Sequence, residues 1–109
     1  MPRGILSTIT AKLNKSISTE TVHAIYSEYF ADSQFVTVLP IGVMPKTAAV
    51  TGSNHVQIQV AVDEHTSRLV VSVAIDNLGK GAAAQAIQNA NLMCGIEEAS
   101  GLKFDGLGV

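Results

Sequence analysis

The 109-residue sequence is poor in charge, has a single cysteine and contains no tryptophan. Asp, Glu, Lys and Arg make up 15% of its residues, whereas an average soluble domain has about 25%. A chain of this length forms one domain, which leaves roughly a third of its unfolded-state surface exposed after folding. With so few charges to cover that surface, we expect part of it to be apolar and to pack against another protein surface.

Other absences exclude whole classes of protein. The net charge of −2 and the pI near 5.8 leave no basic surface for nucleic acid. The uncharged stretch over residues 81–96 is sixteen residues long and carries several amides, so it is too short and too polar to span a membrane. The N-terminus lacks the sustained apolar region of a secretion signal. We therefore predict a cytoplasmic protein with neither nucleic acid nor a membrane as its partner.

No metal site or nucleophile is predicted from the residues. The three histidines fall in separate predicted elements without the spacing of a helical metal site, and they are His23, His55 and His65. Cys94 excludes an internal disulfide. It follows an uncharged alanine-rich segment, far from the positive helix end that would lower the pKa of its thiol. We expect Cys94 to be a small core residue.

The first half of the chain predicts a strand, a helix and a second strand. Residues 4–13 are β-branched and alternating, which is typical of a strand. Ser18 is a good N-cap for a helix that ends near residue 31, and Ile17 and Val22 occupy its hydrophobic-staple positions. Its expected buried stripe is Val22, Ile25, Tyr26 and Tyr29. A short strand over residues 35–39 stops at a proline.

The second half predicts a hairpin followed by a helix. Residues 41–54 read as a long loop with room for a short strand near Ala49. Strands over residues 55–63 and 68–76 form an antiparallel hairpin. A helix from about Lys80 to Met93 is rich in alanine, which predicts that it is enclosed on most sides. The order strand-helix-strand-strand-strand-helix indicates an α+β fold with a largely antiparallel mixed sheet covered by helices.

Two polar segments are weak candidates for a binding site. Residues 76–81 join a buried strand to a helix N-terminus, where free backbone N–H groups and a lysine could hold an anion or a carboxamide. The Gly79-Lys80-Gly81 segment is too short to be a phosphate-binding loop. Residues 52–54 form a polar loop tip that leads into a strand. The residues alone therefore indicate an α+β domain whose binding partner is missing.

Three motifs in order make the chain resemble the N-acetyl-gamma-glutamyl-phosphate reductases. Met-Pro-Arg-Gly-Ile-Leu-Ser-Thr-Ile at residues 1–9 is similar to that family's Pro-Met-x-Arg-Gly-Ile-Leu segment. Val50-Thr51-Gly52-Ser53-Asn54 is similar to its Val-x-Gly-Ser/Thr-Asn loop. The late motif spans residues 74–93, with Ala-Ile-Asp-Asn-Leu, Lys-Gly-Ala and Gln-Ala-Ile-Gln-Asn in the family's order.

The resemblance implies an NADP-dependent enzyme of arginine biosynthesis, which reduces N-acetylglutamyl 5-phosphate to the semialdehyde. Such enzymes, like the aspartate-semialdehyde dehydrogenases, join a Rossmann domain to an α+β domain for catalysis and oligomerisation. Residues 1–109 correspond to the C-terminal part of the latter domain, and the NADP-binding Rossmann domain is absent. The family's catalytic cysteine, in a Gly-Cys-Tyr-Pro setting, and its catalytic histidine are also missing. Cys94 inherits no such role, so we expect no catalytic residue, no turnover and no tight dinucleotide binding.

The resemblance also assigns candidate binding residues. It places Asn77 at the nicotinamide end of NADP, with Lys80 and Gly81 at the adjoining helix start. Arg3 would hold a phosphate or carboxylate, while Ser53 and Asn54 would line the substrate pocket. Purely structural roles are the alternatives: Asn77 as a turn or cap residue and Arg3 at an exposed strand end.

Two interpretations of the whole chain stay open. In the first, it is part of a homo-oligomeric reductase and works only when it is joined to a dinucleotide-binding half. In the second, it is a free-standing assembly module that has kept the sheet and lost the chemistry. In the reductase interpretation, the charge-poor segments, which are the first strand, the second hairpin strand and the last helix, would contact the missing cofactor domain and a neighbouring subunit.

Overall fold

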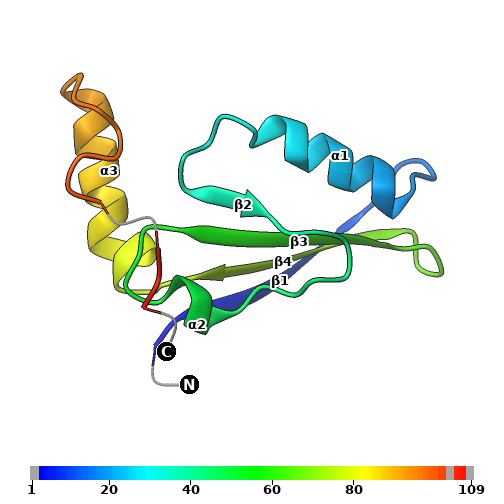
Figure 1. Cartoon of the computed structure of the whole chain (residues 1–109). Coiled ribbons are helices and arrows are strands. Elements are labelled where there is room, and N and C mark those ends of the chain that lie inside the picture. Colours follow the sequence, from blue (N-terminus) through cyan, green and yellow to red (C-terminus); the bar gives the residue numbers. More distant parts are fainter. Residues whose placement is uncertain (1–2, 103–104, 108–109) are drawn as a thin grey trace.

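The computed structural model describes residues 3–102 and 105–107 and forms a four-stranded mixed sheet with a helix packed on one face (Figure 1). Met1, Pro2 and parts of the C-terminal tail lie outside the described residues. The elements are β1 (Ile5–Lys12), α1 (Thr19–Tyr29), β2 (Val36–Val38), α2 (Thr47–Val50), β3 (Val56–Asp63), β4 (Arg68–Ile75), the π-helical turn η1 (Gly79–Ala83) and α3 (Ala84–Met93). The predicted α+β class and element order are confirmed, with α2 added.

The sheet order is β1-β4-β3-β2, antiparallel throughout except for the parallel β2–β3 pair. The predicted hairpin of β3 and β4 is confirmed, with Asp63 opposite Arg68 at its turn. The Asp63 carboxylate accepts the backbone N–H of His65 at 3.1 Å, which supports the tight turn. Alternation along β3 directs its valines and isoleucine toward α1, so the core lies between this helix and the two central strands.

Helix α1 begins as its sequence predicts. The Ser18 hydroxyl oxygen accepts the backbone N–H of Thr21 at 3.2 Å, and Ile17 and Val22 both pack into the core. The expected buried stripe is wrong at two positions, because Ile25 and Tyr29 are exposed, Tyr29 by 79%. The helix packs mainly on β3 and β2, and no described element covers the side chains of Ile25 and Tyr29.

The segment near Ala49 forms the short helix α2 and not the strand that we expected. The Thr51 hydroxyl donates to the carbonyl oxygen of Thr47 at 2.8 Å and closes the single helical turn. Val50 is completely buried, and α2 contacts β4. The turn therefore anchors the loop that leads into residues 52–54.

The expectation that the last helix is enclosed on most sides is wrong for this chain. Helix α3 projects from one end of the sheet (Figure 1), and its two buried side chains are the polar Gln88 and Asn91. Asn91 donates to the carbonyl oxygens of Glu98 and Ser100 at 2.9 and 3.0 Å. Cys94 is exposed, so its prediction as a core residue is also wrong. The alanines permit close packing, but no described segment packs on the outer side of α3.

Candidate functional site

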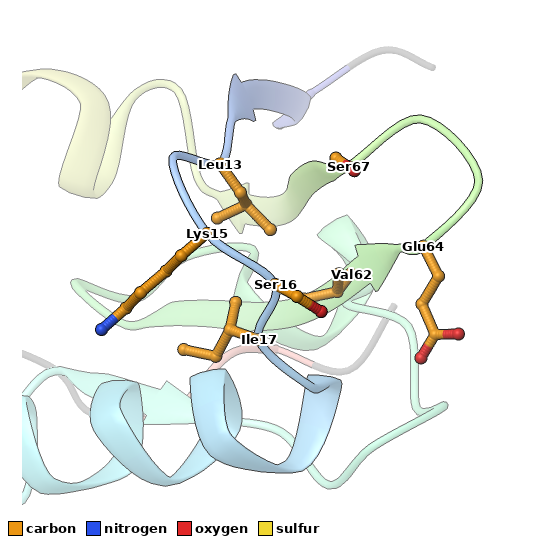
Figure 2. Close-up of a pocket in the computed structure, with 7 residues that line it drawn as sticks. All are labelled: Leu13, Lys15, Ser16, Ile17, Val62, Glu64 and Ser67. Carbon is orange, nitrogen blue, oxygen red and sulfur yellow. The ribbon is translucent and has the colours of Figure 1, made fainter.

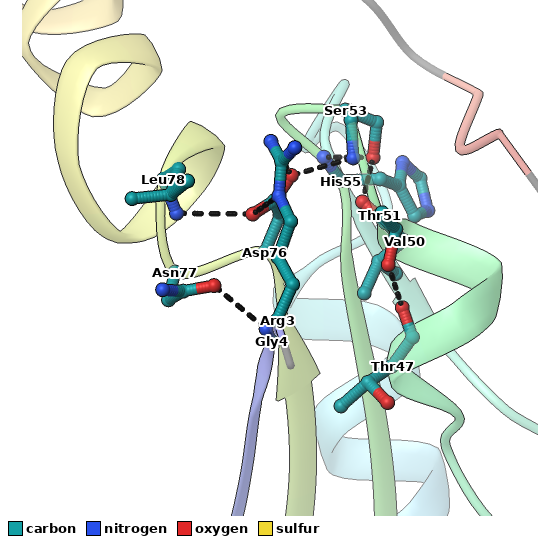
Figure 3. A network of polar contacts seen from close by, with 11 residues as sticks. Arg3, Gly4, Thr47, Val50, Thr51, Ser53, His55, Asp76, Asn77 and Leu78 are labelled. Atoms are coloured by element: carbon teal, nitrogen blue, oxygen red, sulfur yellow. Dashed lines mark hydrogen bonds and ion pairs between the residues drawn. The ribbon is translucent and has the colours of Figure 1, made fainter. Parts of the chain in front are cut away.

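The centre of the site is the carboxylate of Asp76, which follows β4 and is completely buried. Arg3 donates to it twice, from Nε at 2.9 Å and from Nη2 at 2.7 Å. The backbone N–H groups of Gly52 and Leu78 donate to the same carboxylate. Figure 3 shows how this single side chain joins the start of β1, the 50s loop and the entry to η1. Residues far apart in the sequence are thus held at one end of the sheet.

These donors keep Asp76 ionised. The hydrogen bond from Arg3 has the largest effect, and the backbone donors add to it, so the pKa of the carboxyl lies well below its ordinary value despite burial. Because the ionised form is favoured in the folded chain, it contributes stability in full above the unfolded pKa, near 3.8. That contribution is lost as the pH falls below this value toward the folded pKa.

This coupling predicts a pH-dependent difference between the wild type and Asp76→Asn. The wild type should be more stable above about pH 5, and its advantage should shrink as the pH falls through 3.8. Urea unfolding at a series of pH values between 7 and 3 measures the difference, with other carboxyl groups common to both proteins. A difference that stays constant over this range would contradict the ion pair as its source.

The residues around η1 have mainly backbone partners. The Asn77 side-chain oxygen accepts the backbone N–H of Gly4 at 2.6 Å, which leaves its amide nitrogen as a potential donor to a ligand. The Gly81 N–H donates to the carbonyl oxygen of Asp76 at 2.8 Å. A Cβ atom on Gly79 would lie 2.5 Å from the carbonyl oxygen of Ser53. Glycine at position 79 therefore lets η1 approach the 50s loop closely.

The 50s loop is internally braced. The Ser53 hydroxyl donates to the carbonyl oxygen of Val50 at 2.8 Å and accepts the backbone N–H of His55 at 3.1 Å. Asn54 is only 1% exposed, and its amide donates to Gln88 Oε1 at 2.8 Å. The Oδ1 atom of Asn54 is buried without a hydrogen-bond partner among the described residues. Both side chains are thus fixed before any ligand binds.

Gln88 connects the predicted cofactor residue Lys80 to this loop. Its Oε1 accepts the Lys80 ammonium at 2.7 Å, and its amide donates to Glu98 at 2.6 Å. The Lys80 nitrogen lies 5.7 Å from the centroid of the Phe35 ring, within cation–π range. Burial lowers the pKa of Lys80, while the nearby Glu98 charge opposes that shift. Lys80 is therefore held against the body of the domain in this conformation.

His55 lies beside this network. Its Nε2 is 2.6 Å from the Thr37 hydroxyl, and its buried Nδ1 has no partner among the described residues. Burial lowers the pKa of His55, and the Lys80 charge adds to the decrease, whereas Asp105 opposes it. The imidazole is therefore mainly neutral near pH 7.

A pocket of about 230 Å³ opens between the 50s loop, η1 and α3. Three of the predicted site residues, Arg3, Ser53 and Asn54, line it together. Asn77, Lys80 and Gly81 lie on the adjoining segment and do not line the pocket. Because the Arg3 charge is matched by Asp76, the pocket carries little net positive charge, which suits a polar or singly charged group.

Two other pockets are lined by none of the predicted site residues. A cavity of about 350 Å³ lies beside the β3–β4 turn, where Figure 2 shows Lys15 and Glu64 extending away from one another. Both are exposed side chains. A third hollow of about 290 Å³ is lined by the aromatic and apolar side chains of α1. Within residues 3–102 and 105–107, no group of three or more His, Cys, Asp or Glu could hold a metal ion.

The sequence reasoning missed two residues that organise the site, Asp76 and Gln88. The signal for Asp76 is its position directly after an apolar strand, where a buried charge needs hydrogen-bond or ionic partners. The signal for Gln88 is a polar amide side chain within an alanine-rich helix. Neither signal identifies the partner, because Asp76 and Arg3 are 73 positions apart.

Comparisons with known proteins agree with this geometry. Residues 1–77 match the family model described as semialdehyde dehydrogenase, dimerisation domain. N-acetyl-gamma-glutamyl-phosphate reductases from Desulforamulus reducens and Streptomyces clavuligerus are 51% and 52% identical over 107 residues, or 98% of this chain. The chain spans 31% of the length of each relative.

The fold is also found in a solved structure. The crystal structure of aspartate semialdehyde dehydrogenase II from Vibrio cholerae matches 84% of this chain and 27% of its own, with a TM-score of 0.67 and 24% identity. No helix among the described residues is long and apolar enough to cross a membrane. The match of the family model to residues 1–77 leads to one conclusion: the chain belongs to the semialdehyde dehydrogenase dimerisation-domain family.

Proposed function

We propose that the chain is the C-terminal portion of an NADP-dependent reductase that converts N-acetylglutamyl 5-phosphate to N-acetylglutamate 5-semialdehyde. One observation carries the proposal: about half of the residues are identical to reductases of that name over 98% of the chain. The pocket at the end of the sheet supports it, since it brings together side chains from both ends of the sequence.

The binding roles divide between two neighbouring groups. Arg3, Ser53 and Asn54 line one pocket and would contact the acidic substrate. The Asn77 amide nitrogen has no hydrogen-bond partner among residues 3–102 and 105–107 and lies on the segment beside that pocket, which suits the nicotinamide carboxamide of NADP. Gly81 and Lys80 follow it in η1, and Lys80 would leave Gln88 to reach the cofactor. Each role is a proposal for the assembled enzyme.

The exposed apolar surfaces support a partner in a cytoplasmic, homo-oligomeric enzyme. Helix α3 has polar side chains inside, whereas Met93 is 87% exposed and its apolar neighbours Ile87, Leu92 and Ile96 are also exposed. A helix with apolar side chains outside is expected to pack on another surface. We assign α3 to the contact with the dinucleotide-binding portion, and the sheet to contacts between subunits.

The isolated chain is expected to show no turnover and no tight cofactor binding. The catalytic cysteine and histidine implied by the family resemblance belong to the remaining two-thirds of the reductase. Incubation with NADP, phosphate and N-acetylglutamate semialdehyde should give no NADPH absorbance, and titration calorimetry with NADP should give no heat of binding at micromolar concentration. Turnover by the chain alone would contradict the assignment.

The second candidate function is a free-standing assembly module. It is favoured by the sheet, which has its own core and contains all four strands within the residues that match a dimerisation-domain model. Translating the DNA upstream of Met1 separates the two functions. A continuing reading frame with a glycine-rich dinucleotide fingerprint and a Gly-Cys-Tyr-Pro motif supports the reductase. A stop codon and an independent ribosome-binding site support the module.

A further inference from the structure

The chain that follows α3 returns from that helix to the 50s loop, so it reaches two walls of the candidate pocket. The Asn91 side chain donates two hydrogen bonds to backbone carbonyl oxygens at the beginning of this segment. Gly101 and Leu102 then line the pocket together with α3. Residues 105–107 lie beside α2, where the red part of the ribbon in Figure 1 shows them.

Leu107 covers the 50s loop at the residue that bonds to Asp76. Its backbone N–H donates to the carbonyl oxygen of Thr51 at 2.7 Å. A Cβ atom on Gly52 would lie 2.9 Å from Cγ of Leu107, so the leucine side chain packs directly on the glycine backbone. The N–H of Gly52 donates to the Asp76 carboxylate. Leu107 thus holds the loop by a backbone hydrogen bond and by an apolar contact.

Gly106 packs too closely on α2 to carry a side chain. A Cβ atom at this position would overlap the carbonyl oxygen of Ala49 and would lie 2.7 Å from its carbonyl carbon. Both are backbone atoms of a helical turn and cannot move aside as the end of a flexible side chain can. The φ of Gly106 is not in the left-handed region, so close packing is what requires glycine here.

We propose that residues 105–107 form a strap that holds the 50s loop in its substrate-binding conformation, with Gly106 and Leu107 as positioning residues. The inference rests on the proposed function, because it takes Ser53 and Asn54 as substrate contacts. Neither Gly106 nor Leu107 lines the pocket. Their effect on substrate binding must therefore pass through the loop.

The conformation of the 50s loop needs support from outside the loop. It keeps Asn54 Oδ1 buried without a hydrogen-bond partner among the described residues, which costs free energy. Without the strap, part of the population would leave this conformation, and the apparent substrate affinity would fall in proportion to the fraction that keeps it. Bound substrate would still hold the loop in place. Loss of the strap should therefore raise the substrate KM and leave kcat nearly unchanged.

Gly106→Ala tests the strap in a reductase that carries this chain in place of the 107 matching residues of the Desulforamulus reducens enzyme. The added methyl group should displace the strap and raise the KM for N-acetylglutamate semialdehyde about tenfold, with kcat and the KM for NADP within about twofold of the unmutated chimera. Leu107→Ala should act in the same way, whereas Leu107→Met, which keeps the apolar contact, should retain the original KM. Met44→Ala is the control, since Met44 is exposed and does not line the pocket.

Amide hydrogen exchange on the isolated chain tests the strap without any activity. In Gly106→Ala, the amides of Leu107 and Gly52 should exchange at least about tenfold faster than in the wild type, while the Val71 amide in the central strand β4 should be unchanged. A chain that ends at residue 104 removes the strap altogether and gives the same comparison if Gly106→Ala does not fold.

The outcomes separate the strap from the proposed function. Fast exchange at Leu107 with wild-type exchange at Gly52 overturns the strap. An unchanged semialdehyde KM in the chimera that ends at residue 104 overturns it as well, and so does a fall in kcat that accompanies equal increases in both KM values. An unmutated chimera that folds without turnover contradicts the proposed function instead, and the exchange rate of the Gly52 amide then decides whether the strap holds the loop.

Discussion

Asn77→Ala is expected to raise the KM for NADPH about fivefold in a chimeric reductase. The chimera carries this chain in place of the 107 matching residues of the Desulforamulus reducens enzyme. The Asn77 amide nitrogen is the group we assign to the nicotinamide carboxamide, and one neutral hydrogen bond contributes about 0.5–1.5 kcal/mol, which corresponds to a factor of about two to ten. Initial rates of NADPH oxidation at varied cofactor concentration measure the change.

A second substitution separates binding from structure at the same position. Asn77 also accepts the backbone N–H of Gly4, and Asn77→Asp keeps that acceptor while it removes the amide donor. If the donor binds the cofactor, the aspartate variant should lose NADPH affinity as the alanine variant does. The exposed Asn14 provides the control, since Asn14→Ala should leave the kinetics unchanged. Wild-type kinetics in both Asn77 variants would remove the assignment.

Asp76→Asn is expected to lower the free energy of unfolding by about 3 kcal/mol at pH 7. The Asp76 carboxylate is buried, whereas the Arg3 side chain is 38% exposed, so the loss comes from the hydrogen bonds that the carboxylate accepts. Hydrogen bonds to a charged group contribute about 1.5–3 kcal/mol, and the amide nitrogen would face donors from Arg3 and from the backbone. The total free energy of unfolding of a protein domain is about 5–15 kcal/mol, so this loss is a large fraction of the domain's stability. Urea unfolding followed by circular dichroism provides the measurement.

Asp32→Asn is the matched control for that experiment. Asp32 is exposed, and surface substitutions generally change stability by less than about 0.5 kcal/mol. If the two variants were equally stable, the Asp76 carboxylate would not be the centre that holds β1, the 50s loop and η1 together.

Local sequence signals predicted the parts of the fold that depend on neighbouring residues. The Ser18 cap, the hydrophobic staple and the alternation along β3 each follow from a few adjacent side chains, and the structure has all three. The loop of residues 52–54 and the segment of residues 76–81 were also recognised as polar junctions. The structure brings them together at one end of the sheet.

Long-range arrangement accounts for what the sequence did not predict. The spacing of Tyr29 is that of a buried residue, but Tyr29 is exposed because α1 packs on β3 and β2 through other side chains, with Val22 in the core. The alanines of α3 indicate close packing without indicating whether the surface they contact is in this chain. Asp76 and Gln88 gain their roles from partners that no local pattern identifies.

The central claim is that this chain supplies one part of a reductase and works only with the rest of it. The most direct test is the rate of NADPH oxidation with N-acetylglutamyl 5-phosphate, measured in parallel for the isolated chain and for the chimera. We predict no rate above background for the chain alone. For the chimera we predict a rate within about tenfold of the parent enzyme, which corresponds to a change of at most about 1.4 kcal/mol in the activation free energy. A chimera that folds and binds NADPH but shows no turnover would contradict the claim.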